Sequence, residues 1–149
     1  MPVMAVAKFQ RFFRAAAGLD VDKNDLKRYT DFVNDKIYDL LIMGQATAKA
    51  NDRDVIQFWD LPVTKGLQEN IHSFGKIDEE IELRPILDYL ASRPPLDVAL
   101  GEEAEERLPD VAGGISVALG RVLKVIDPEL KNPATAEWEY AFRIFHLLL

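Results

Sequence analysis

The sequence of 149 residues contains no cysteine and only two histidines, His72 and His146. The missing thiols exclude a disulfide framework, a thiolate metal site and a cysteine nucleophile. Two histidines, each expected on an ordinary helix surface, do not make a histidine-rich metal site. We therefore expect no metal and no cofactor.

Long apolar runs are also missing from the sequence. No run approaches the roughly 20 apolar residues that span a bilayer. The apolar stretch near the N-terminus is too short and too interrupted for a signal peptide. We therefore expect a cytoplasmic protein without a membrane partner. The few Asn and Gln residues are typical of a thermophile protein.

Positive charge is scarce in the second half of the chain. The net charge of −7 arises there, because residues 1–75 carry ten Lys and Arg against ten Asp and Glu, whereas residues 76–149 carry eight against fifteen. An acidic surface repels nucleic acid at long range, so any DNA binding would depend on a local basic patch.

Recognisable catalytic motifs are absent from the sequence. The acidic run 102–106 is typical of a helix start or a solvated face rather than of a metal site. Gly113 and Gly114 lie inside an apolar helical pattern, which predicts close helix crossing and not a phosphate-binding loop. No serine, histidine and acid share a spacing that suggests a triad. We predict that the protein is not an enzyme and has no small-molecule substrate.

The apolar spacing of the first half predicts three helices. The first covers about residues 3–17 and stops at Gly18. The second, capped by Asp22 or Asn24, is long, with an apolar stripe at steps of three or four residues. After an extended connector at residues 55–56, Asp60 is expected to cap a third helix that stops at Gly75. The stripe of the long helix comprises Leu26, Tyr29, Val33, Ile37, Leu40, Gly44 and Ala48.

The second half repeats this order of helices. A helix is predicted over about residues 79–91, followed by a Pro-rich loop over 93–101. A long helix then begins at either Glu102 or Pro109 and ends before Pro128. The last helix follows a loop over 131–134, and its predicted buried face comprises Trp138, Phe142, Phe145 and Leu149.

Two helix–long helix–helix units in one chain predict an all-α protein with a single compact domain, 1–149. Residues 1–76 form the first unit and residues 77–149 the second, divergent one. A long helix with two short neighbours cannot close its own core, so a second unit is expected to lie across it. An unrelated six-helix orthogonal bundle is the alternative.

The segment 48–60 resembles the second loop of the histone fold. There an arginine is followed three residues later by an isoleucine and seven residues later by an aspartate, as in Arg53, Ile56 and Asp60 here. Residues 11–18 are similar to the basic, apolar first helix of archaeal histones. The whole chain resembles the bacterial family of double histone-fold proteins of unknown function.

This resemblance implies a histone-fold pseudo-dimer, with Arg53, Asp60 and Ile56 as a structural clamp. Asp60 at a helix start would accept the guanidinium of Arg53 at both oxygens. The sequence departs from the histone pattern at Val55, which stands where histones have threonine. Residues 132–135, at the matching loop of the second half, lack the arginine and aspartate.

Two functions are compatible with this fold. We predict a non-enzymatic interaction or assembly module that contacts a protein partner or a second copy. The candidate contact residues are Trp138, Phe145, Leu148 and Leu149. The alternative is a divergent histone-like DNA-binding protein, although the acidic matching loop 96–106 disfavours it. Its candidate phosphate contacts are Lys8, Arg11, Arg14, Lys23 and Lys49.

Overall fold

The computed structural model describes residues 3–90 and 95–149, and the described chain is mainly α-helical, as predicted. Within these residues it contains six α-helices, one short 3-10 helix and two strands of two residues each. The elements are, in chain order, α1 (Val3–Ala17), α2 (Lys23–Ala50), β1 (Val55–Ile56), η1 (Phe58–Asp60), α3 (Lys65–Ile81), α4 (Arg84–Leu90), β2 (Ala99–Leu100), α5 (Glu102–Ile126) and α6 (Thr135–Leu148).

The long helix α2 forms where the apolar stripe predicted it, and all seven stripe residues are buried. Asp22 caps its start and accepts a hydrogen bond from the Asp25 N–H at 2.7 Å. The carboxylate of Asp25 in turn accepts the Asp22 N–H at 3.0 Å, which completes a capping box. With 28 residues, α2 is about 42 Å long.

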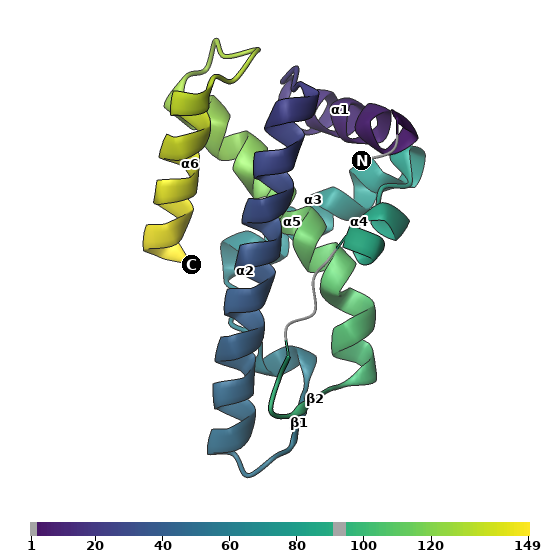
Figure 1. Cartoon of the computed structure of the whole chain (residues 1–149), viewed down its shortest axis with the longest axis vertical. Helices are drawn as coiled ribbons and strands as arrows, with labels where there is room; N and C mark the ends of the chain where they lie inside the picture. Colours follow the sequence, from purple (N-terminus) through teal and green to yellow (C-terminus); the bar gives the residue numbers. More distant parts are fainter. Residues whose placement is uncertain (1–2, 91–94) are drawn as a thin grey trace.

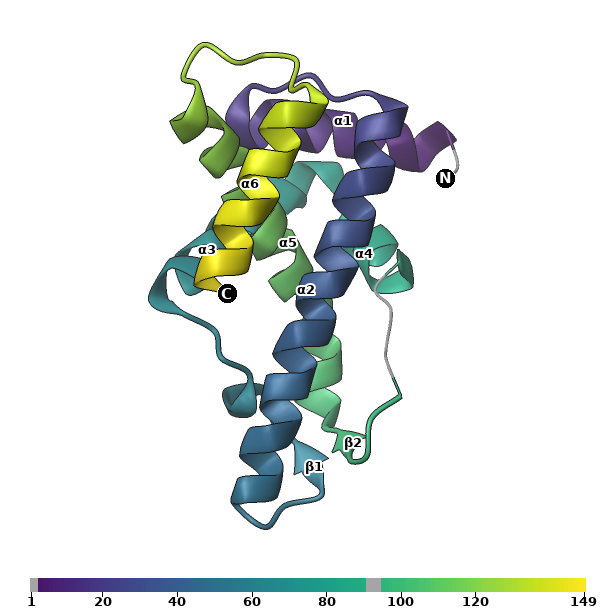
Figure 2. The same ribbon diagram turned by 60° about the vertical axis from the view of Figure 1, so that its left-hand side comes forward.

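The two long helices, α2 and α5, cross at the centre of the molecule (Figures 1 and 2). At the crossing the hydroxyl groups of Tyr29 and Ser116 lie 2.6 Å apart, and both residues are fully buried. Ser116 also donates to the Ala112 carbonyl at 2.7 Å. Since serine has a single O–H, Tyr29 is the donor to Ser116. One polar contact therefore joins the two halves inside the core.

Helix α3 packs closely on α5 at the glycine pair. A Cβ atom at Gly113 would overlap the ring of Phe74, and one at Gly114 would contact Ile71. Both glycines are buried within α5. The prediction that this pair permits a close helix crossing is therefore confirmed.

Loops from different halves of the chain meet at two ends of the molecule. At the lower end in Figure 1, β1 and β2 pair in parallel, with Val55 opposite Ala99 and Ile56 opposite Leu100. At the upper end, the Asp20 N–H donates to the Lys131 carbonyl at 2.6 Å. Each end therefore joins one loop of the first half to one loop of the second.

The third helix differs from its prediction at both ends. It begins after Thr64, whose hydroxyl accepts the Leu67 N–H at 3.1 Å, and not after Asp60, which ends the turn η1. It continues through Gly75 because Phe74 and Ile81 extend its buried face. It ends at Ile81, and the next residue, Glu82, adopts a left-handed φ of 58°. The expected junction between residues 76 and 77 thus lies inside α3.

The starts of helices α4 and α5 can be compared with their predicted positions. Helix α4 begins at Arg84 and not near residue 79, so Pro85 lies in its first turn, where proline is tolerated, and does not kink it. The predicted end at residue 91 and the start of the Pro-rich loop at residue 93 lie outside the described residues. Helix α5 begins at Glu102, the first of the two expected starts, and includes Pro109.

Candidate functional site

Arg53 and Asp60 form a two-pronged ion pair at the loop between α2 and α3. The two guanidinium nitrogens of Arg53 each lie 2.6 Å from a carboxylate oxygen of Asp60. Asp60 also accepts the Gln57 N–H at 2.8 Å, and Ile56 beside it is fully buried. The hydrogen bonds from Arg53 hold the pKa of the Asp60 carboxyl below its usual value. The pair fastens the loop to the turn η1.

Three of the five candidate DNA contacts are engaged within the chain. Arg14 pairs with Asp20 at 3.0 Å, and Lys49 pairs with Asp97 at 2.7 Å. Lys8 donates to the Glu82 carbonyl at 3.3 Å. These contacts direct the cations toward protein acceptors and reduce the charge available to a phosphate.

The other two candidate DNA contacts, Arg11 and Lys23, are exposed on α1 and at the start of α2. Neither has an ion pair within residues 3–90 and 95–149. The acidic run 102–106 forms the first turns of α5 beside β2, at the opposite end of the molecule. Lys49 lies in the last turn of α2, at the opposite end of that helix from Lys23, so the five candidates do not form one continuous basic surface.

The four candidate protein-contact residues separate into two groups. The prediction was wrong for Trp138 and Phe145, which are buried. Their rings pack in the core, with Trp138 against Phe13 and Phe145 against Phe32. Leu148 is 75% exposed and Leu149 is half-buried, so only these two of the four candidates reach the surface.

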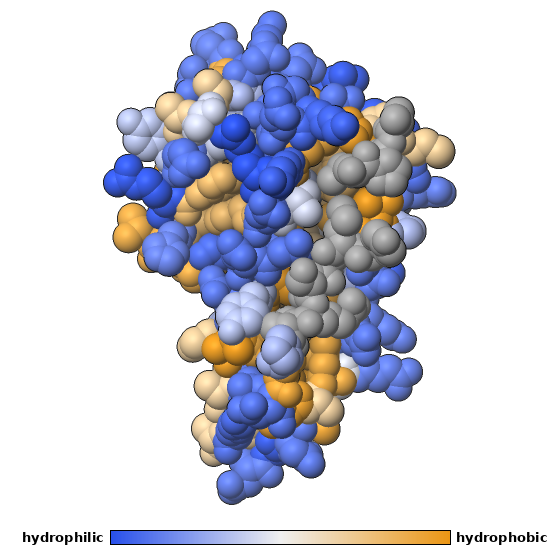
Figure 3. All heavy atoms as spheres, in the orientation of Figure 1, coloured by the Kyte–Doolittle hydropathy of each residue, from blue (hydrophilic) through white to orange (hydrophobic). Residues whose placement is uncertain are grey.

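Helix α6 carries a second apolar face that points away from the core. Tyr140, Ile144, Leu147 and Leu148 follow one another at helical spacing on this face, and we call them the α6 ridge. Leu147 is 83% exposed, and Tyr140 is exposed as well. In Figure 3 apolar side chains reach the surface at the left edge of the molecule, beside the last turns of α6.

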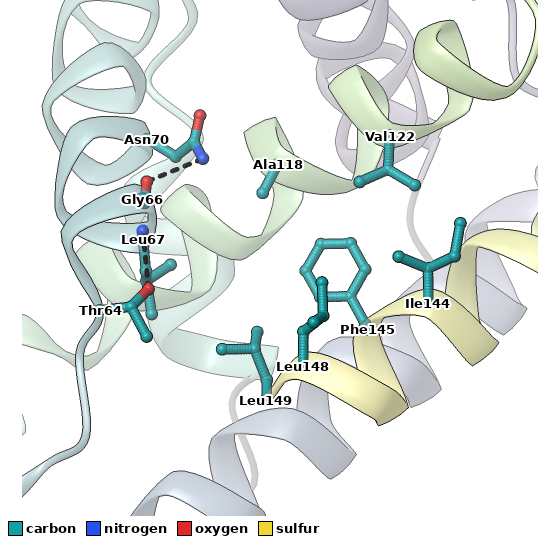
Figure 4. Close-up of a pocket in the computed structure, with 10 residues that line it drawn as sticks. All are labelled: Thr64, Gly66, Leu67, Asn70, Ala118, Val122, Ile144, Phe145, Leu148 and Leu149. Carbon is teal, nitrogen blue, oxygen red and sulfur yellow. Dashed lines mark hydrogen bonds between the residues drawn. The ribbon is translucent and has the colours of Figure 1, made fainter.

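A pocket of about 250 Å³ adjoins the α6 ridge (Figure 4). Its floor is α5, its walls are the start of α3 and the end of α6, and its lining is mostly apolar. A neighbouring pocket of about 470 Å³ lies between α2 and the same end of α6. The pocket of Figure 4 is lined by Thr64, Gly66, Leu67, Asn70, Ala118, Val122, Ile144, Phe145, Leu148 and Leu149.

One buried charge was not anticipated from the sequence. The side chain of Lys36 is only 5% exposed, and its ammonium lies 3.4 Å from the Asp39 carboxylate and 5.8 Å from the centre of the Phe32 ring. Its position four residues after Phe32 and four before Leu40, both buried, was the available signal. Lysine covers apolar surface with its alkyl stem in such places.

The described chain shows no other arrangement that suggests chemistry. His72 and His146 are both exposed on helices. Among residues 3–90 and 95–149, no three side chains of the metal-binding types come together. In the same residues no helix combines the length and the apolar character that crossing a bilayer requires. The ion pair of Arg53, the α6 ridge and its pocket are therefore the features to explain.

Comparison with known proteins places this chain among proteins without an assigned role. Residues 9–146 match the family described as "Domain of unknown function (DUF1931)". The chain belongs to this family. Two relatives from Aquifex aeolicus (strain VF5), each called an uncharacterized protein, are 27% identical over 92% of this chain and 80% of the relative, and 30% identical over 86% and 82%.

Solved structures share the architecture of this DUF1931 protein. A crystal structure from Thermus thermophilus is 54% identical and has a TM-score of 0.87, with 97% of each chain covered. A crystal structure from Aquifex aeolicus is 25% identical and has a TM-score of 0.85, with 97% of this chain and 95% of the other covered. The arrangement of helices is therefore kept at low sequence identity.

Proposed function

We propose that this DUF1931 protein is a histone-fold pseudo-dimer that acts as a non-enzymatic module for protein interaction and assembly. The architecture is supported by the crossed helices α2 and α5, one from each half. It is also supported by the two loop pairings, β1 with β2 and Asp20 with Lys131, which join the halves reciprocally. The two-pronged contact of Arg53 with Asp60 agrees with the histone resemblance of that loop.

The α6 ridge is the observation that carries the interaction role. Monomeric proteins rarely leave neighbouring large apolar side chains in water, and such patches mark interaction sites. Leu147 and Leu148 are both mostly exposed, and they adjoin a preformed apolar pocket. Covering a surface of this kind with a partner removes apolar side chains from water, and this burial stabilises the complex.

DNA binding is the second candidate function, and Arg11 and Lys23 favour it. Both cations are exposed, and neither has an ion pair in the described part of the chain. A protein that neutralises only a few phosphates releases few counterions, so its electrostatic affinity for DNA is weak. The chain's net charge of −7 further weakens such binding.

A titration of labelled duplex DNA, followed by fluorescence anisotropy at about 50 mM salt, separates the two functions. The interaction role predicts no saturable binding, and it predicts the same result for the triple variant Arg11→Glu, Arg14→Glu, Lys23→Glu. Circular dichroism confirms that the variant is folded. Tight binding that weakens with salt and disappears in the triple variant would favour the DNA-binding function instead.

A further inference from the structure

A pocket of about 430 Å³ lies between the middle of α2 and the second half of α6, and we call it the α2–α6 pocket. Phe32 and Phe142 stack there, with ring centres 4.4 Å apart and planes at 18°. In Figure 3 apolar surface is visible between α6 and α2, with hydrophilic side chains around it. The pocket therefore combines aromatic rings with charged groups. It is lined by Phe32, Asp35, Lys36, Tyr38, Asp39, Phe142, Arg143 and His146.

The wall that α2 contributes to this pocket carries negative charge. Asp35 and Asp39 are four residues apart, so they lie on the same face of the helix, and both are exposed. The buried ammonium of Lys36 lies 3.4 Å from Asp39 and offsets the charge of that carboxylate. Asp35 has no ion pair in the described part of the chain. The α2 wall therefore keeps one unpaired carboxylate.

The wall that α6 contributes carries positive charge. Arg143 and His146 are three residues apart on the same face of the helix, and both are exposed. Neither has an ion pair with residues 3–90 or 95–149. Arg143 does not reach Asp35 or Asp39, although all three side chains line the same pocket. Opposite charges therefore lie on the two walls without contacting each other.

We propose that the α2–α6 pocket binds a small zwitterion, whose ammonium group contacts Asp35 and whose carboxylate contacts Arg143. A flat body between the two charges would stack against the half-buried ring of Phe142. The imidazole of His146 can donate a further hydrogen bond to the carboxylate.

Volume and charge both favour this class of ligand. A volume of about 430 Å³ lies within the range of small-molecule pockets, roughly 300–1,000 Å³. A zwitterion pairs with the charges on both walls, whereas a ligand with a single charge pairs with one wall and leaves the other unpaired. The α2–α6 pocket shares no lining residue with the pocket of Figure 4, so this binding goes beyond the interaction role proposed above.

Three probes of similar shape test the need for both charges. The zwitterion 4-(aminomethyl)benzoate carries an ammonium group and a carboxylate at opposite ends of a benzene ring, and 4-methylbenzylamine and 4-methylbenzoate each keep one of these charges. Binding to the isotope-labelled full chain is measured by NMR titration. We expect a dissociation constant on the order of 1 mM for the zwitterion, and at least about tenfold weaker binding of the other two probes. The signals of His146 should shift, and those of His72, exposed on α3, should not.

Two pairs of matched variants locate the binding site. Asp35→Asn removes the unpaired carboxylate and should weaken binding of the zwitterion at least about fivefold. Asp54→Asn makes the same change at an exposed residue beside β1 and should leave binding unchanged. Arg143→Gln should also weaken binding at least about fivefold, whereas Arg11→Gln, an equal change of charge on α1, should have no effect. Circular dichroism confirms that each variant is folded.

The proposal is wrong if the zwitterion causes no saturable shifts up to about 10 mM, or if it binds Asp35→Asn and Arg143→Gln as tightly as the natural chain. It is also wrong if a probe with a single charge binds as tightly as the zwitterion. The amine would then assign the pocket to organic cations, and the benzoate would assign it to anions. None of these results bears on the α6 ridge, so the interaction role keeps its own test.

Discussion

The contact of Tyr29 with Ser116 makes the crossing of α2 and α5 measurable by mutation. Both residues are fully buried, and their hydroxyl oxygens lie 2.6 Å apart. Burial raises the pKa of Tyr29 above its ordinary value, so the phenol stays protonated and continues to donate. The two single variants therefore remove the same hydrogen bond but leave different groups behind.

The structure predicts unequal costs for the two single variants. Tyr29→Phe removes the donor, and Ser116 keeps its bond to the Ala112 carbonyl, so a loss of about 0.5–1.5 kcal/mol is expected. Ser116→Ala leaves the buried phenol without its acceptor, at a cost of about 1–3 kcal/mol. The gain in helix propensity from alanine, about 0.5 kcal/mol, offsets part of this cost. In the double variant no orphaned hydroxyl remains.

Urea denaturation followed by circular dichroism measures all four proteins of this cycle. We expect Ser116→Ala to be the less stable single variant, and in thermal unfolding its Tm should fall by about 2–4 °C for each kcal/mol lost. Adding Tyr29→Phe to Ser116→Ala should cost nothing or restore stability, so that the coupling energy exceeds about 0.5 kcal/mol. Strictly additive losses would show that the two hydroxyl groups do not meet, and would refute this account of the crossing.

Further predictions concern the ion pair of Arg53 with Asp60 and two glycines. Asp60→Asn should lower the free energy of unfolding by about 1–3 kcal/mol in urea denaturation, because its two charged hydrogen bonds with Arg53 weaken. Arg53 lowers the pKa of Asp60, so the stabilisation by this pair is present above the ordinary Asp pKa and is lost as the pH falls through the lowered pKa of Asp60. Arg53→Met should therefore flatten the acid side of a profile of Tm against pH. Gly113→Ala should destabilise strongly by forcing a shift of Phe74, whereas Gly75→Ala, with open space around it, should raise stability by about 0.5–1 kcal/mol in the same assay. Equal effects of the two alanine variants, or an unchanged pH profile, would contradict these assignments.

The periodic parts of the fold could be predicted from the sequence. The stripe of α2 predicted a long helix because burial of one helix face repeats about every 3.6 residues. The end of α3 could not be predicted in this way. Gly75 resembles a helix stop, but a glycine ends a helix only where the backbone turns left-handed, and here Glu82 makes that turn. Packing of Phe74 and Ile81 outweighs the low helix propensity of glycine.

The candidate site was less predictable because α6 is apolar on two faces. Trp138 and Phe145 occupy one face, and Tyr140 and Leu147 occupy the other. Spacing alone does not identify which face meets the core. The pocket depends on three segments that are distant in the sequence, so no local pattern reveals it. The ion pair of Arg53 with Asp60 was expected because segment 48–60 resembles the second loop of the histone fold.

The uninterrupted course of α3 through the middle of the chain limits how the protein can be divided. A cut between residues 76 and 77 would remove Ile77 and the buried Ile81 from the end of that helix. The first fragment would then expose apolar surface that α5 normally covers. The second would lose Phe74 and Ile71, which pack against Gly113 and Gly114. Separate expression of the two pieces should therefore yield insoluble or unfolded polypeptides.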